Sequence, residues 1–179
     1  MNKKILMLIG FLLIGYLGTS QEISKDSKWD VSATLGATKL YNNSTLNTGD
    51  NVNVGLSLEA TRLFDNHLFV SAGTTFSTLR STFLWDNPLN YFSIDLYGGY
   101  RFKSSGLTNY SLAIGTSYIS APNTVLNGSS SFSLNFSGGF IFWFRDSNYG
   151  IILRNTYKAS MDNNFVSHNR FSMGLAYKI

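Results

Sequence analysis

The sequence ends in FSMGLAYKI, residues Phe171 to Ile179, and this segment is the clearest indication of the architecture. Large apolar residues occupy every second position, and small or polar residues stand between them. A period of two is typical of a β-strand whose two faces meet different surroundings. Because the polar face carries almost no bulk, it is unlike the charged surface of a soluble protein. The pattern indicates a strand in a wall between lipid and a narrow polar interior.

The first twenty residues have the features of a secretory signal peptide. Lys3 and Lys4 form a short positive region, an apolar run covers 5–17, and small residues at 18–20 suit cleavage. We therefore expect residues 1–20 to be removed. A retained anchor helix is the alternative, but the run is short for a helix that crosses a bilayer.

Composition also favours a membrane wall. Without the signal, 159 residues remain, and 12 Lys and Arg nearly balance 10 Asp and Glu, so nothing points to nucleic acid. Charged residues make up 13% of the chain, about half their usual share in soluble domains. Cysteine is absent, which excludes disulfides. Since no later apolar run is long enough for a membrane helix, a chain that crosses a membrane must do so as a closed barrel. We expect a short periplasmic segment at 21–28 and one barrel domain at 29–179.

The alternation predicts eight strands joined by connections of alternating length. The predicted strands cover 29–40, 52–64, 67–78, 91–103, 109–120, 131–144, 149–157 and 170–179. The short connections are 65–66, 104–108 and 145–148, and the long ones are 41–51, 79–90, 121–130 and 158–169. Short turns at one rim and long loops at the other are typical of an all-β, eight-stranded, antiparallel up-and-down transmembrane barrel, with the short turns periplasmic.

The strand period assigns a lipid face and an inner face. Leu58, Ile94 and Leu134 should face lipid, and the serines that precede each of them should face inward. Fourteen aromatic residues then fall on the lipid face near the two rims: Trp29, Phe64, Phe102, Tyr110, Phe144, Tyr149 and Tyr177 on the short-turn side, and Tyr41, Phe76, Phe92, Tyr118, Phe132, Tyr157 and Phe171 on the long-loop side. Aromatic girdles of this kind mark membrane interfaces. A soluble lipocalin-type barrel has the same strand count, but its outer face would be rich in Lys and Glu, whereas here it would be Ser, Thr, Gly and Asn.

On these features the chain resembles the small eight-stranded outer-membrane β-barrels, the family of the outer membrane protein A membrane domain and the outer membrane protein X type. The family's terminal assembly signal matches Ser172, Gly174 and Tyr177, and Ile179 stands where an aromatic residue is commoner. The resemblance implies a monomer in the outer membrane of a Gram-negative-type bacterium. It also implies contact with outer-membrane lipid and lipopolysaccharide, and recognition by the barrel assembly machinery through the C-terminal strand. No peptidoglycan-binding domain is expected.

Few charges fall on the inner face: Asp30, Glu59, Asp95, Arg101, Lys103, Arg154, Lys158, Arg170 and Lys178. Glu59 and Arg154 should lie at similar heights, with Asp95 and Arg170 close by. Buried charges must pair or be solvated. The sequence thus predicts a structural network of Glu59, Asp95, Arg154 and Arg170 that fills the interior. The alternative is a switchable gate in a minor channel.

No catalytic, cofactor or metal site is expected. His67 and His168 are isolated, and without cysteine they do not form a metal-ligand pattern. Ser167 and His168 are adjacent in sequence, so in a strand they point to opposite faces. The predicted function is a non-enzymatic outer-membrane barrel that is structural or presents surface loops to an unknown ligand. A small-solute channel and a lipid A-modifying enzyme on the same barrel remain as alternatives.

Overall fold

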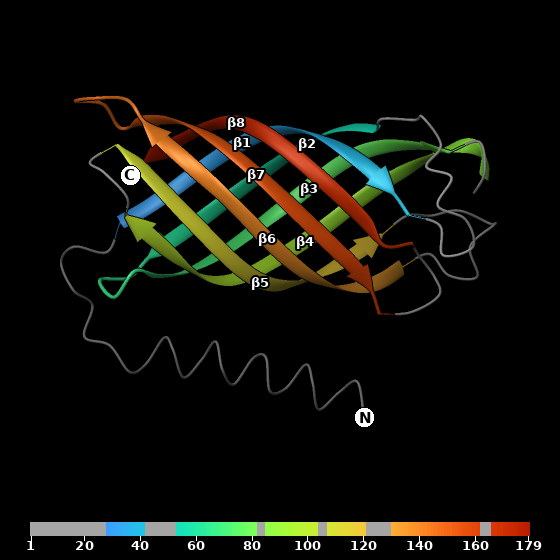
Figure 1. Ribbon diagram of the computed structural model, residues 1–179. Helices are drawn as coiled ribbons and strands as arrows, with labels where there is room; N and C mark the ends of the chain where they lie inside the picture. The colour runs from blue at the N-terminus through green and yellow to red at the C-terminus, as the bar shows by residue number, and fades with distance from the viewer. Residues whose placement is uncertain (1–27, 42–52, 82–84, 104–106, 121–129, 162–165) are drawn as a thin grey trace.

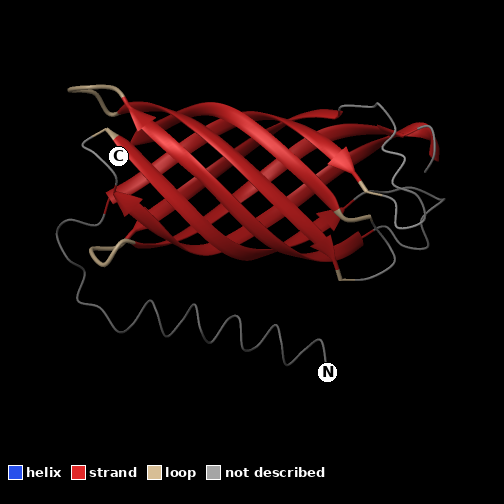
Figure 2. Cartoon of the chain, viewed as in Figure 1, coloured by secondary structure: helices blue, strands red, loops and turns tan. Residues whose placement is uncertain are grey.

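The computed structural model describes residues 28–41, 53–81, 85–103, 107–120, 130–161 and 166–179. The predicted signal peptide and the segment that follows it therefore lie outside the described residues. The strands are β1 Lys28–Leu40, β2 Asn53–Leu63, β3 Leu68–Ser81, β4 Trp85–Lys103, β5 Thr108–Ser120, β6 Ser130–Trp143, β7 Tyr149–Ser160 and β8 His168–Lys178. Each pairs antiparallel with its sequence neighbours, and β1 pairs with β8, so the sheet closes into a barrel (Figures 1 and 2). The predicted eight-stranded antiparallel barrel is confirmed. The described residues contain no helix long and apolar enough to cross a membrane.

The C-terminal strand closes the barrel in a continuous ladder. β8 pairs with β1 from Asp30 opposite Lys178 to Leu40 opposite His168. On its other side it pairs with β7 from Tyr149 opposite Tyr177 to Lys158 opposite His168. The alternating stretch that ends the sequence is therefore the strand that seals the wall.

The exposures of the side chains match the predicted faces. Leu58 and Ile94 are 48% and 46% exposed, whereas Ser93 and Ser133 are fully buried inside. Most of the fourteen girdle aromatics are exposed on the outer wall; Phe64, Tyr41 and Phe92 are half-buried there. Apolar side chains cover the outside and Ser and Thr line much of the inside, an arrangement suited to lipid outside.

The short turns lie at one rim, on the side of the C-terminus (Figure 1). The connection between β2 and β3 covers the four residues 64–67, and His67, with a φ of 65°, lies outside the strand predicted for it. Its amide donates to the carbonyl of Phe64 over 3.0 Å. In the turn between β6 and β7, Asp146 has a φ of 54°, a value that Asp tolerates better than most residues.

The prediction of a long loop at 79–90 is wrong, because β3 runs to Ser81 and β4 already begins at Trp85. The pairing of β3 with β2 ends at Ser77, opposite Gly55, and the pairing of β4 with β5 ends at Phe92. Beyond these points β3 and β4 pair only with each other. Pro88 lies in the part of β4 without a β5 partner, where a missing amide is tolerated. The polar and proline residues at 86–90 indicated a loop, although these residues belong to β4. At the last loop, Lys158–Ser160 likewise belong to β7, and His168 and Asn169 to β8.

A small apolar core lies inside the barrel toward the short-turn rim. Ile141, Trp143, Ile152 and Ala176 form one buried cluster, and each is at most 4% exposed. Phe69 is buried at the same rim. We did not predict this core, although the strand period assigns these residues to the inner face.

Candidate functional site

Three ion pairs cross the barrel interior, and each joins strands that are not neighbours. Arg101 of β4 pairs with Asp30 of β1, Arg154 of β7 with Glu59 of β2, and Lys158 of β7 with Asp95 of β4. Side-chain exposure is at most 18% in each pair. Charges this far from water need partners, and these three carboxylates and three cations supply one another.

The pair of Glu59 and Arg154 occupies the middle of the interior. Arg154 Nη1 donates to Glu59 Oε2, and the Thr61 hydroxyl donates to Oε1 over 3.1 Å. Both oxygens of the carboxylate therefore accept a hydrogen bond. The structure thus brings together the two residues that the sequence placed at similar heights.

Asp95 lies against Lys158 rather than Arg170. Lys158 Nζ donates to Asp95 Oδ1 over 2.6 Å, to Ser93 Oγ over 3.0 Å and to the Tyr91 hydroxyl over 3.2 Å. All three ammonium protons thus have an acceptor. Ser117 donates to the same carboxylate and itself accepts from Asn135 Nδ2 over 2.5 Å. This network is one that sequence reasoning missed, although Lys158 had been assigned to the inner face.

Arg170 is a cation of the described interior that stands outside the three ion pairs. It is 6% exposed, and its Nη2 donates to the backbone carbonyl of Gly55 over 2.7 Å. Its Nη1 is buried without a hydrogen bond, and no described carboxylate forms an ion pair with it. The guanidinium lies where a side chain at Gly36 would be, 2.6 Å from Nε to the position of a Cβ atom. Arg170 is therefore packed into the wall rather than joined to the network.

Toward the short-turn rim, the interior of the barrel is occupied by the apolar core and by two cations that lie against aromatic rings. Lys178 lies over the ring of Trp143, 4.0 Å from its centroid, and Arg101 over the ring of Phe69 at 5.7 Å. Cations on aromatic faces and buried isoleucines together form a layer of side chains across this end. The side chain of Lys103, the remaining predicted inner charge, lies outside the described side chains.

The two histidines lie at opposite ends of the barrel. His67 is exposed in the first short turn, and His168 is buried near the long loops, with Nε2 3.2 Å from the Tyr91 hydroxyl. Ser167 Oγ accepts a hydrogen bond from the amide of Ser160 over 3.1 Å. Among the described residues no three His, Cys, Asp or Glu side chains lie close enough to share a metal ion.

The residues of the predicted assembly signal occupy distinct places in β8. Ser172 is buried and donates to the carbonyl of Arg154 over 3.4 Å, and Gly174 packs directly against the backbone of β1. The ring of Tyr177 lies on the outer wall, 4.9 Å from that of Tyr149. Ile179 is 74% exposed, and its amide donates to the carbonyl of Trp29 over 2.8 Å.

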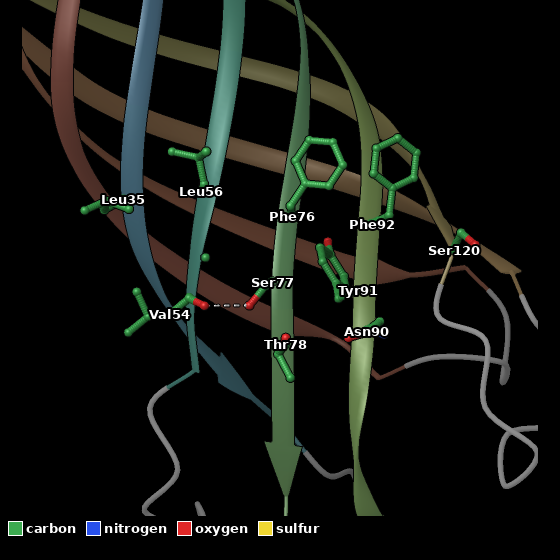
Figure 3. A pocket seen from close by; sticks show the side chains of 11 residues that line it. Leu35, Val54, Leu56, Phe76, Ser77, Thr78, Asn90, Tyr91, Phe92 and Ser120 are labelled. Carbon is green, nitrogen blue, oxygen red and sulfur yellow. Dashed lines mark hydrogen bonds between the residues drawn. The ribbon is translucent and has the colours of Figure 1, made fainter.

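A hollow of roughly 680 Å³ lies on the outer wall near the long-loop rim. Figure 3 shows Leu35, Val54, Leu56, Phe76 and Phe92 around it, together with the hydrogen bond from Ser77 to the Val54 carbonyl. Its lining is largely apolar and carries no charged side chain. The hollow is thus mainly a part of the lipid-facing wall, and its lining has one titratable side chain, that of Tyr91.

The closed eight-stranded wall, the apolar exterior and the polar interior define a class: the chain has the fold of the small outer-membrane β-barrels, which are bacterial membrane proteins. It is similar to Neisserial surface protein A, with a TM-score of 0.66 and 16% identity over 84% of this chain and 97% of that one. It is also similar to Ail, the attachment invasion locus protein of Yersinia pestis, in complex with the heparin analogue sucrose octasulfate, with a TM-score of 0.62 and 16% identity over 86% and 99%. For the N-terminal β-barrel domain of Pseudomonas aeruginosa OprF the TM-score is 0.54 at 10% identity, over 84% and 97%. No family model and no curated protein matches the sequence. The predicted resemblance to eight-stranded outer-membrane barrels is confirmed.

Proposed function

We propose that the protein is a non-enzymatic barrel of a Gram-negative-type outer membrane whose work is done by its long loops at the cell surface. The observation that carries the proposal is the filled interior. Three crossing ion pairs and a buried apolar layer occupy space in the interior that a channel would need. With the wall facing lipid and the interior occupied, the long loops are the surface left for contact.

The composition of the loops narrows the kind of ligand. The connections between strands at this rim, 41–52, 82–84, 121–129 and 161–167, contain two aspartates and no Lys or Arg, and they are rich in Asn, Ser and Thr. Polyanions are bound mainly by clusters of Lys and Arg. Although Ail was crystallised with a sulfated sugar, these loops favour an uncharged polar ligand, such as a neutral glycan, recognised through hydrogen bonds.

The test compares the whole protein with a variant in which 42–51 and 121–129 are each replaced by a two-residue turn. Both proteins are displayed on cells and applied to arrays of neutral and sulfated glycans. We expect neutral glycans or host surfaces to bind the whole protein and not the trimmed one. Binding restricted to sulfated glycans, or retained after trimming, would contradict the proposal.

Conductance in planar bilayers tests the filled interior separately. We expect no sustained conductance from the wild-type barrel, because its cross-section is occupied by side chains. A steady conductance that Trp143→Ala increases would favour the minor channel instead. Lipid A isolated from cells with and without the protein should have the same mass profile, and a reproducible mass difference would favour the enzyme.

A further inference from the structure

Two charged side chains lie on the outward face of the described strand residues, and both are cations. Lys39 lies near the end of β1 at the long-loop rim, and Arg62 lies near the end of β2 at the short-turn rim. All other charged side chains described in the strands point inward. A charge is costly on a wall that otherwise carries Leu, Ile, Val and aromatic residues, so each of these two cations should have a partner or a role near its position.

Arg62 is held between two aromatic rings of the short-turn girdle. Its Cζ atom lies 5.4 Å from the ring centroid of Phe64 and 5.8 Å from that of Trp29, which stands opposite Arg62 in the ladder between β1 and β2. Both distances are within the range in which a cation is attracted to a ring face. The rings therefore fix the direction of a side chain that would otherwise be free to move.

The guanidinium has no anionic partner in the described protein. Its Nε is buried without a hydrogen bond, and Arg62 forms none of the ion pairs found among the described residues. Asp65 lies three residues further along the chain, exposed in the turn, and does not reach it within ion-pair distance. Because Nε is covered by protein, the site offers a preorganised cation whose Nη donors are the ones left for a ligand.

The membrane supplies a matching anion at this depth. Aromatic girdles mark the boundary between the hydrocarbon and the headgroups, so the guanidinium lies where lipid phosphates lie. The planar fork of Arg donates two parallel hydrogen bonds to two oxygens of a phosphate, which an ammonium does not do. We propose that Arg62, clamped by Trp29 and Phe64, binds the phosphodiester of a phospholipid headgroup in the leaflet at the short-turn rim.

The site should prefer an anionic phospholipid. A glycerol headgroup leaves the phosphate charge free for Arg62, whereas an ethanolamine headgroup brings its own ammonium close to that phosphate. We therefore expect phosphatidylglycerol to be retained more strongly than phosphatidylethanolamine. This inference rests on the membrane location in the proposed function, but it concerns the lipid wall and not the loops.

Native mass spectrometry of the full-length mature barrel, released from vesicles that contain equal parts of the two phospholipids, tests the site. The variants are Arg62→Gln, Arg62→Lys, Trp29→Leu and the matched control Lys39→Gln, which removes the outward cation of the opposite rim. We expect Arg62→Gln to reduce retained phosphatidylglycerol about tenfold, since one charge-assisted hydrogen-bonded contact is removed. Arg62→Lys and Trp29→Leu should give intermediate losses, because the fork or the clamp is missing.

Several results would overturn the proposal. One is unchanged lipid retention in Arg62→Gln, and another is an equal loss of lipid in Lys39→Gln. A third is full displacement of the lipid by inorganic phosphate, which would mean that the site binds free phosphate and is not specific for a phospholipid. Insertion is measured first by the gel mobility of the folded barrel. A wild-type protein that failed to insert would contradict the membrane location instead, so the two failures are distinguishable. If Arg62→Gln does not fold, the comparison of Arg62→Lys with Lys39→Gln decides the question.

Discussion

Removing one partner of the pair between Glu59 and Arg154 should be more costly than removing both. Arg154→Met strands a carboxylate that is 9% exposed, and Glu59→Gln strands a guanidinium that is 18% exposed. For a fully buried pair such a change costs about 3–5 kcal/mol. Here the residual exposure of Arg154 and the Thr61 hydroxyl, which still bonds the carboxylate, reduce the effect. We expect about 2–3 kcal/mol for each single variant.

The double variant isolates the interaction between the two side chains. Because it strands neither charge, it should be less destabilised than the two single variants predict together, with a coupling energy on the order of 2 kcal/mol. The assay is equilibrium urea unfolding in lipid vesicles, followed by tryptophan fluorescence. The control cycle combines Glu59→Gln with Lys39→Gln, which lies on the other face, and it should be additive within about 0.5 kcal/mol. A coupling no larger than that of the control would refute the reasoning.

Three further variants, one of them with a matched control, test other parts of the wall in the same unfolding assay. Arg170→Met should cost about 1 kcal/mol or less, because the cation has no described carboxylate and only its bond to the Gly55 carbonyl is lost; a cost equal to that of Arg154→Met would contradict this. Leu58→Arg should cost about 2–4 kcal/mol as a charge on the lipid face, and wild-type stability would place Leu58 elsewhere. Gly174→Ala should cost about 1–3 kcal/mol, since its Cβ would lie 2.6 Å from Thr34 Cα. The control Gly98→Ala should change stability by no more than about 0.5 kcal/mol, because its Cβ would have no neighbour within 4 Å. Equal effects of the two variants would refute the packing argument.

Strand number and side-chain faces could be predicted from the sequence, because both follow from the alternation of apolar and polar residues along each strand. Leu58 and Ser93 lie on the predicted faces for that reason. Partners across the interior depend instead on the stagger between strands, which no single strand encodes. Asp95 was therefore assigned to the neighbourhood of Arg170, whereas the long side chain of Lys158 reaches it from β7.

The inner apolar core and the long hairpin were missed for different reasons. Trp143 and Ile152 stand at inner positions by the period, but the predicted polar interior left no place for them. The hairpin of β3 and β4 outgrows the barrel because its two strands pair with each other after β2 and β5 have ended. Asn and Pro at 87–90 indicated a loop, but Pro88 needs only a strand without a second neighbour.

The three crossing ion pairs also bear on how the barrel closes. They join residues 71, 95 and 63 positions apart, so no single hairpin can form any of them. If β1 met β8 two residues out of step, every side chain would keep its correct face, and the hydrophobic pattern alone would not oppose the error. Glu59 of β2 and Arg154 of β7 lie on the two sides of this seam, so the slip would carry these two charges about 7 Å apart along the strands. Two unpaired charges in the interior would then oppose the misaligned barrel, so that this pair favours one shear among those that the alternation permits.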